Sequence, residues 1–150
     1  MFINFAGVIH LIVEERYKLN MEFSAGTIKK INEHVIEISF SKDGEIDEKM
    51  ALDILSKIIT LSEGGPHALL YNFNKKNVVL SDIAKKLSGV RNYNNVNLIS
   101  RAMVTQSMVS NIESSHYVQN TKPEAETKVF NDREKALAWL NQKVEAFLQI

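Results

Sequence analysis

The sequence predicts a single α/β domain in which a mixed β-sheet, made of an N-terminal hairpin followed by αβ units, is covered by about four helices. The first observation is "HVIEISF" (34–40), which alternates in polarity as a strand does. The second is a pair of apolar runs without alternation, "HALLYNF" (67–73) and "NLISRAMVT" (97–105), typical of strands covered on both faces of a parallel sheet. The third is a short strand, "ETKVF" (126–130), that leads directly into a well-marked helix.

Residues 1–20 are expected to be an N-terminal extension to a domain over residues 21–150. The opening "MFINFAGVIHLIVEER" has no basic segment before its apolar run and no small-residue cleavage site after it, so we do not expect a signal peptide. It is also too short to span a bilayer. The extension is interpreted either as an added strand or as an appendage of no importance to the core, and Met21 is an alternative start.

The first half of the domain should contain a hairpin and a helix. In "HVIEISF", Ile36, Ile38 and Phe40 share one face, which predicts a half-buried strand, and the weaker strand "FSAGTIKKI" precedes it across a short turn. After the turn "SKDGEID", Asp47 can accept the free backbone N–H groups of a helix over residues 48–62, and Gly64 offers a left-handed residue to end it.

The middle of the chain should hold the centre of the sheet, in the strand over residues 67–73. The loop "NKKNVV" follows, and Ser81 is predicted to cap a short helix that carries Ile83, Leu87 and Val90. After the strand over residues 97–105, Ser107 can cap a helix over residues 108–119.

The last αβ step is the most clearly marked one. Asn131 and Glu134 form a capping-box pattern at the start of the helix, and Asp132 adds favourable negative charge to its first turn. The apolar residues of this helix recur at helical spacing and should face the sheet: Ala136, Leu137, Leu140, Val144 and Phe147.

Composition limits the functional classes. Eighteen basic residues balance eighteen acidic ones, so no overall field favours nucleic acid or an anionic membrane, which leaves only a local patch open, and no nucleic acid is expected as a partner. Without cysteine, the chain has no disulfide, thiolate nucleophile or cysteine-ligated metal. A reducing compartment is compatible with this composition, and we expect a cytoplasmic protein without a membrane span.

The sequence lacks the common catalytic and metal-binding motifs. The four histidines show no HxxxH or HxH spacing, "EGGPH" follows a helix where a phosphate loop would precede one, and there is no GxSxG motif. We therefore expect no enzyme, no metal site and no cofactor.

From the hairpin to "VFNDREKALAWL", over about residues 22–142, the chain resembles the STAS/SpoIIAA-like domains, in particular a small bacterial group with a C-terminal Phe-x-Asp…Ala-Leu-x-Trp-Leu signature. The matching positions are Phe130, Asp132, Ala136, Leu137, Trp139 and Leu140, with Pro123 upstream. The resemblance implies a small regulatory or scaffolding domain without catalytic residues, which binds protein partners or, in some relatives, small or lipid-like ligands.

The sequence departs from this family at the phosphorylatable serine of the anti-sigma factor antagonists. There an Asp-Ser-Ser-Gly-like turn starts the helix after the central strand, whereas this chain reads "VVLSDIAKKL". Ser81 precedes Asp82, and no glycine follows. Ser81 is therefore interpreted as a helix cap rather than a phosphorylation switch.

Two classes of function remain open. The first is an interaction module that docks a protein partner through the loop and helix after the central strand, or that associates with itself as a homodimer. Its candidate residues form a polar, locally basic rim: Asn74, Lys75, Lys76, Ser81 and Asp82. The second is a carrier of a small apolar or lipid-like ligand between helix and sheet, with Phe73, Met103 and Met108 as candidate lining.

Arg101 stands out in its apolar strand: if buried it would need a carboxylate partner, and at an edge it would reach water.

Overall fold

The structure is a computed structural model that describes residues 20–89, 97–121 and 123–149. The strands in chain order are β1 (Asn20–Phe23), β2 (Gly26–Lys30), β3 (Val35–Phe40), β4 (Gly44–Ile46), β5 (His67–Asn72), β6 (Val78–Leu80), β7 (Leu98–Val104) and β8 (Glu126–Phe130). The helices are α2 (Glu48–Ser62), α3 (Asp82–Gly89), α4 (Met108–Thr121) and α5 (Arg133–Leu148).

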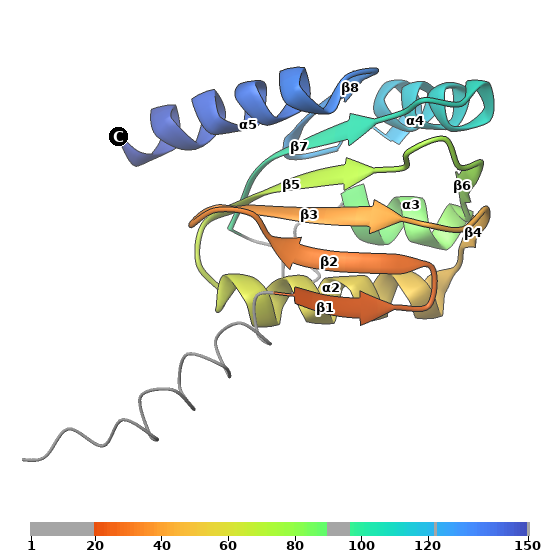
Figure 1. The fold of residues 1–150 in the computed structure, drawn as a ribbon, viewed down its shortest axis with the longest axis horizontal. Coiled ribbons are helices and arrows are strands. Elements are labelled where there is room, and N and C mark those ends of the chain that lie inside the picture. Colours follow the sequence, from red (N-terminus) through yellow and green to blue (C-terminus); the bar gives the residue numbers. More distant parts are fainter. Residues whose placement is uncertain (1–19, 90–96, 122, 150) are drawn as a thin grey trace, which may run out of the picture.

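The main sheet confirms the predicted fold class (Figure 1). Six strands lie in the order β1-β2-β3-β5-β7-β8. The β1–β2 and β2–β3 pairs are antiparallel, so the N-terminal strands form hairpins, whereas β3–β5, β5–β7 and β7–β8 are parallel. The strand β5 is central, as expected, because it has a parallel neighbour on each side and all of its residues are buried.

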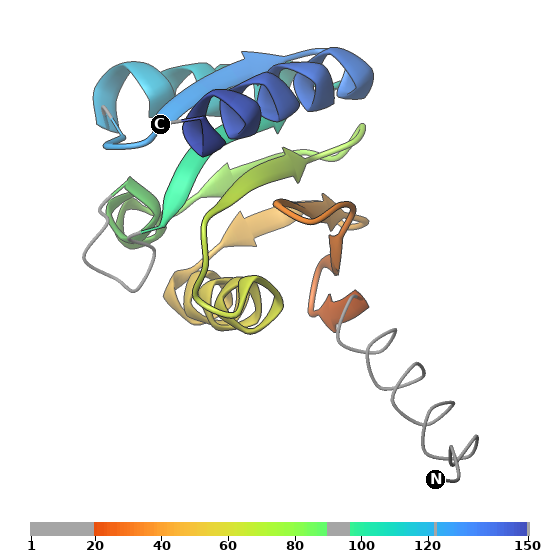
Figure 2. The ribbon, with the colours of Figure 1, turned by 90° about the vertical axis from the view of Figure 1, so that its left-hand side faces the viewer.

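The helices cover the two faces of the sheet unequally (Figure 2). On one face, α2, α3 and α4 enclose the larger apolar core, which includes Ile38, Ile58 and Tyr117. On the other face, α5 is the one described helix that covers a smaller core, to which it contributes Ala136, Leu140 and Val144. Helix α5 lies mainly against β5, β7 and β8 and reaches β3 through Arg133, so β1 and β2 extend beyond it.

The half-buried character predicted for the strand over residues 34–40 is wrong. Five of the six residues of β3 are buried, including Val35 and Glu37 on the face that was expected to be open. The reason is long-range: α5 arrives from the other end of the chain, where Val35 joins its core and Arg133 covers Glu37. Periodicity within one strand cannot reveal such a cover.

A second, two-stranded sheet was not predicted. Strands β4 and β6 pair in parallel, in segments that were interpreted as a turn and a loop. The backbone N–H of Gly44 donates to Asn77 O at 3.0 Å and that of Ser81 to Ile46 O at 3.0 Å, which ties the two segments together at both ends. Each strand has three residues, too few for a periodic signal.

Three helix starts agree with the sequence and one is displaced. The predicted caps Asp47, Ser81 and Ser107 each accept a hydrogen bond from a backbone N–H of the first turn, at 2.8, 3.1 and 3.1 Å. In α5, however, the cap is Asp132 and not Asn131: its carboxylate accepts from the N–H groups of the second and third helical residues at 2.8 and 3.2 Å. Asp132 lies one residue closer to the helix and carries a full charge, which suits the helix N-terminus.

Helix α4 lies with its apolar residues outward. Met108, Val109 and Ile112 are exposed, whereas Ser110, Ser114 and Tyr117 are buried. The Ser110 hydroxyl donates to Lys76 O at 2.6 Å and accepts from the N–H of Val78 at 2.9 Å. This face of α4 therefore provides hydrogen-bond partners for backbone groups before and within β6, which an apolar face could not provide.

The N-terminal extension was predicted over residues 1–20, and all of these residues except Asn20 lie outside the described part of the chain. Val90, which was predicted on the helix capped by Ser81, also lies outside it. Among the residues that the structure describes, no helix is long and apolar enough to cross a membrane.

Candidate functional site

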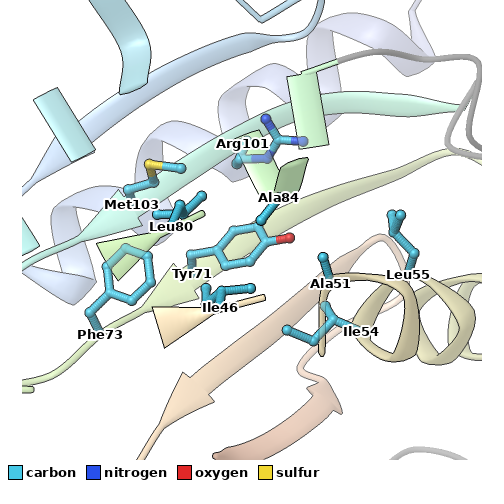
Figure 3. Close-up of a pocket in the computed structure, with 10 residues that line it drawn as sticks. All are labelled: Ile46, Ala51, Ile54, Leu55, Tyr71, Phe73, Leu80, Ala84, Arg101 and Met103. Carbon is cyan, nitrogen blue, oxygen red and sulfur yellow. The ribbon is translucent and has the colours of Figure 1, made fainter. Parts of the chain in front are cut away.

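An opening lined by ten described residues lies between the helical layer and the sheet (Figure 3). We call it the hollow. It contains about 480 Å³ of space free of atoms, counting its mouth. The described residues that line it are Ile46, Ala51, Ile54, Leu55, Tyr71, Phe73, Leu80, Ala84, Arg101 and Met103.

The hollow is lined by side chains from one face of the sheet and by small residues of the helices that face it. Tyr71 and Phe73, two residues apart, point to the same face of the sheet, and Arg101 and Met103 do so on the neighbouring strand. The helices α2 and α3 present Ala51 and Ala84 there. An alanine fills less of the gap between helix and sheet than a larger apolar side chain would, so space remains.

Arg101 is the one charged residue among the described residues that line the hollow. It is 1% exposed on β7, which lies between β5 and β8, so the expected alternative of an edge position is wrong. Its Nη1 donates to the Tyr117 hydroxyl at 2.8 Å. Its guanidinium carbon lies 5.8 Å from the ring centroid of Tyr71 and 5.9 Å from that of Tyr117, within the range of cation–π attraction.

Tyr71 is the other polar residue of the lining. Burial raises the pKa of its hydroxyl, more than the nearby positive charge of Arg101 lowers it. The hydroxyl is therefore protonated throughout the neutral range, where it can donate a hydrogen bond. The hollow thus combines an aliphatic and aromatic wall with two adjacent donors, a guanidinium and a phenol.

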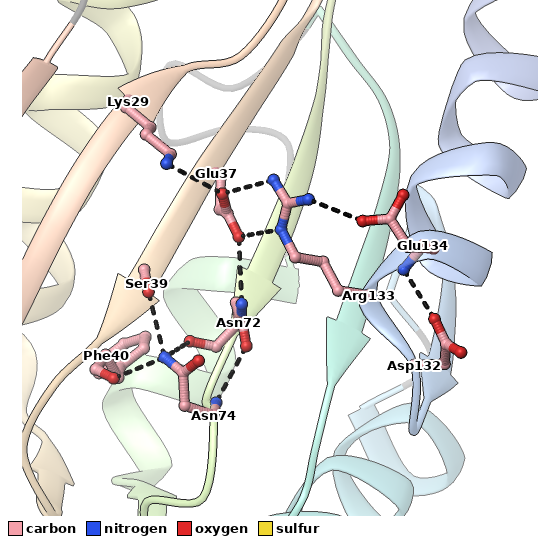
Figure 4. Close-up of polar contacts among 9 residues, drawn as sticks. All are labelled: Lys29, Glu37, Ser39, Phe40, Asn72, Asn74, Asp132, Arg133 and Glu134. Atoms are coloured by element: carbon pink, nitrogen blue, oxygen red, sulfur yellow. Dashed lines mark hydrogen bonds and ion pairs between the residues drawn. The ribbon is translucent and has the colours of Figure 1, made fainter.

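A second polar group lies on the opposite face of the sheet, centred on the buried carboxylate of Glu37 (Figure 4). Arg133, in the first turn of α5, holds it with two hydrogen bonds of 2.9 Å, from Nε to Oε2 and from Nη2 to Oε1. The Asn72 amide donates to Oε2 at 3.1 Å, and Lys29 Nζ lies 3.8 Å from Oε1. We call these four residues the Glu37 cluster.

Electrostatics favour the ionised form of Glu37. Burial alone would raise the pKa of this carboxyl, but the hydrogen bonds from Arg133 and Asn72, with the charges of Arg133 and Lys29, outweigh burial and lower it below its ordinary value. The pKa of Arg133 is raised, chiefly by its hydrogen bonds to Glu37. The cluster is a satisfied ion pair that fastens the start of α5 to β3, and we assign it a structural role.

The predicted rim residues fall into two groups. Asn74 has a left-handed backbone (φ 54°), and its amide donates to Phe40 O at 2.8 Å and Ser39 Oγ at 3.1 Å, so it ties the ends of β3 and β5 together. Lys75 is exposed, while Lys76 is half-buried and its carbonyl accepts from Ser107 Oγ at 3.1 Å.

The other two rim residues, Ser81 and Asp82, lie beyond β6 at the start of α3. The hydroxyl of Ser81 is engaged by the N–H of Ala84, as a cap, and Asp82 is exposed. The rim thus gathers at one end of the sheet, but β6 separates its lysines from its serine (Figure 1).

The three residues expected to line a ligand pocket are also divided. Phe73 and Met103 line the hollow. Met108 does not belong to the described lining; it is 79% exposed on α4. Within residues 20–89, 97–121 and 123–149, no three His, Cys, Asp or Glu residues lie close enough together to hold a metal ion.

Sequence reasoning missed Tyr71, Tyr117 and the Glu37 cluster. The position of Tyr71 could have been predicted, because Tyr71 lies two residues before Phe73 in a buried strand and therefore points to the same face. A buried tyrosine there brings a hydroxyl into the core. The pairing of Glu37 with Arg133 spans 96 residues, and nothing in one sequence links the two positions.

The fold and the hollow together define a small α/β domain with a mostly apolar opening between sheet and helices. The chain belongs to a family described as a domain of unknown function (DUF7793), which matches residues 28–144. The match runs from β2 into α5 and includes all the described residues that line the hollow. No curated protein matches the chain, and no solved structure matches it.

Proposed function

We propose that this protein is a non-enzymatic domain that holds a small, largely apolar molecule in the hollow. The observation that carries the proposal is the composition of the lining: eight of its ten described residues are apolar, with Tyr71 and Arg101 adjacent to one another. Small-molecule sites are typically concave, mostly apolar and provided with a few polar groups, and the described lining of the hollow has this composition.

The resemblance to STAS/SpoIIAA-like domains belongs to the same proposal. It is supported by the antiparallel hairpin at the start, the parallel strands that follow, and the terminal helix that packs back on the sheet. In that helix Trp139 contacts Phe130, with ring centroids 5.6 Å apart, so two positions of the shared signature meet. Regulation by a bound small molecule, rather than by phosphorylation of Ser81, is the role we assign to such a domain here.

Native mass spectrometry of freshly purified protein tests this function. The wild-type chain should retain a small molecule. Ala51→Phe, which places a ring in the hollow, should lose it. Leu52→Phe is the matched control, because Leu52 is the next residue of α2 and is exposed outside the hollow. A retained molecule that survives Ala51→Phe, or a wild-type protein that neither retains nor takes up apolar compounds, would contradict the proposal.

A second candidate is the interaction module, favoured by apolar residues that face solvent on α3 and α4. Ile83 is 49% and Ile112 60% exposed, and an ion pair between Lys85 and Glu113 (3.8 Å) joins the two helices. Exposed apolar side chains rimmed by charges are typical of protein-binding surfaces. Affinity capture with wild type and with Ile112→Asp tests this candidate: a partner lost by the variant supports it, and equal capture by both removes its support.

A further inference from the structure

We propose that the hollow is selective for an amphipathic monocarboxylate, an acid with an apolar tail, whose carboxylate binds Arg101. This inference rests on the proposed function of the hollow and names the chemical class of its ligand. It concerns the polar end of the site, which the apolar lining alone does not explain.

The first argument is the position of the guanidinium. Arg101 lies in the middle of β7, 1% exposed, and lines the described wall of the hollow beside Tyr71 (Figure 3). A fully buried position in the middle of a strand, two residues before Met103 of the larger core, would ordinarily hold an apolar residue. Burying a charge there is costly, and a charge buried against an opening is typical of a site that recognises the opposite charge.

The second argument is the local geometry of the donors. The guanidinium is planar and presents its N–H groups as a fork that matches the two oxygens of a carboxylate. Its hydrogen bond to Tyr117 (2.8 Å) and the two flanking rings fix its orientation. A carboxylate would add the Coulomb attraction between opposite charges, which the neutral Tyr117 hydroxyl does not offer to this cation.

Tyr71 supplies a second donor. Its side chain is 8% exposed and lies against the same opening as Arg101. Because burial keeps its hydroxyl protonated at neutral pH, the phenol can donate to one oxygen of a carboxylate while Arg101 binds the other. A guanidinium beside a phenol therefore suits an anion and repels a cation.

The size of the polar part of the lining favours a carboxylate over a phosphate ester. A phosphate monoester brings three acceptor oxygens and close to two charges. Only two of the ten described lining residues are polar, so most of those oxygens would face aliphatic and aromatic groups. A carboxylate has two oxygens and one charge. Its tail would lie against Leu55, Phe73 and Leu80.

Isothermal titration calorimetry with three probes of equal tail length tests the inference: octanoate, octan-1-ol and octylamine, each at neutral pH. Octanoate should bind the wild-type protein about tenfold or more tightly than octan-1-ol, the gain expected of hydrogen bonds to a charged group. Octylamine should bind more weakly than the alcohol. Arg101→Met should reduce octanoate to the affinity of the alcohol, and Tyr71→Phe should weaken octanoate alone.

The outcomes separate the inference from the function on which it rests. Equal binding of octanoate and octan-1-ol to the wild type would overturn the carboxylate site and leave the apolar hollow standing. Binding of none of the three probes would contradict both. The wild-type probe series decides the question even if Arg101→Met does not fold, and a thermal melt of each variant shows whether it does.

Discussion

At the scale of single residues, Glu37 is a carboxylate buried on the α5 side of the sheet and held by hydrogen bonds and charges. It is 2% exposed, and its carboxylate is contacted by Arg133, Asn72 and Lys29. Removing one partner of a buried ion pair is costly because the remaining charge is left without compensation. The cluster should therefore matter for stability well beyond an ordinary surface ion pair.

We predict that Glu37→Gln lowers the free energy of unfolding by about 1.5–3 kcal/mol at neutral pH, the usual contribution of hydrogen bonds to charged groups. The folded protein lowers the pKa of Glu37, so its stabilising effect is present above the unfolded-state pKa and is lost as the pH falls through the folded-state value. The gap between wild type and variant should close on acidification, as measured by urea denaturation across the pH range.

The control for this prediction is Glu134→Gln. Glu134 also contacts Arg133, at 3.3 Å, but its side chain is 80% exposed. Exposed ion pairs contribute little, so this variant should differ from wild type by less than about 1 kcal/mol at every pH. A Glu37→Gln gap that is equally large in acid would show that the ionised carboxylate is not what stabilises the site.

At the scale of elements, α5 closes one face of the sheet unaided. The residues that it buries, Ala136, Leu140 and Val144, follow the helical spacing predicted from the sequence, while Phe147 is 43% exposed because it lies in the last turn of α5. The core that these residues share with β3, β5 and β7 is the smaller of the two. Among the described helices, only α5 contributes buried residues to that core.

We predict that Leu140→Ala lowers the free energy of unfolding by about 2–5 kcal/mol, because Leu140 is fully buried and its truncation leaves a cavity. Phe147→Ala, in the same helix, should cost clearly less. Urea denaturation of both variants gives the comparison. A loss below about 1 kcal/mol for Leu140→Ala would mean that α5 does not hold this face of the sheet.

The orientation of helix α4 is not visible in its sequence pattern. Met108, Val109 and Ile112 are exposed, and Ser110 and Ser114 face inward. The orientation is decided by the polar backbone groups at β6, because these groups need hydrogen-bond partners and the inward face of α4 supplies them. That requirement exists only once the two-stranded sheet has formed, so it is invisible to a window of residues along the chain.

At the scale of the whole molecule, long buried strands and marked helix caps could be predicted because both are local signals. Strands β3, β5 and β7, and helices α2 and α5, follow from polarity patterns and from residues such as Asp47. What escaped prediction depends on contacts between distant segments: the β4–β6 pair, the Glu37 cluster, and the burial of Arg101 between Tyr71 and Tyr117. Of the candidate ligand residues, Phe73 and Met103 were found from the sequence because they lie on buried strands.

The unequal covering of the sheet also explains why the hollow lies where it does. Three helices share one face, and the hollow opens between two of them, α2 and α3, and the sheet. The short strands β4 and β6 contribute Ile46 and Leu80 to its wall. On the opposite face, α5 packs on the smaller core, and its residue Arg133 binds Glu37 of β3.

The central claim, that the hollow is the binding site, is tested most directly by methionine methyl NMR during titration with octanoate. Two methionines report on the two candidate surfaces: Met103 lines the hollow, and Met108 is exposed on α4. We predict that the methyl resonance of Met103 shifts in a saturable manner while that of Met108 stays in place. A shift of Met108 with Met103 unmoved, or no saturable shift of either, would contradict the claim.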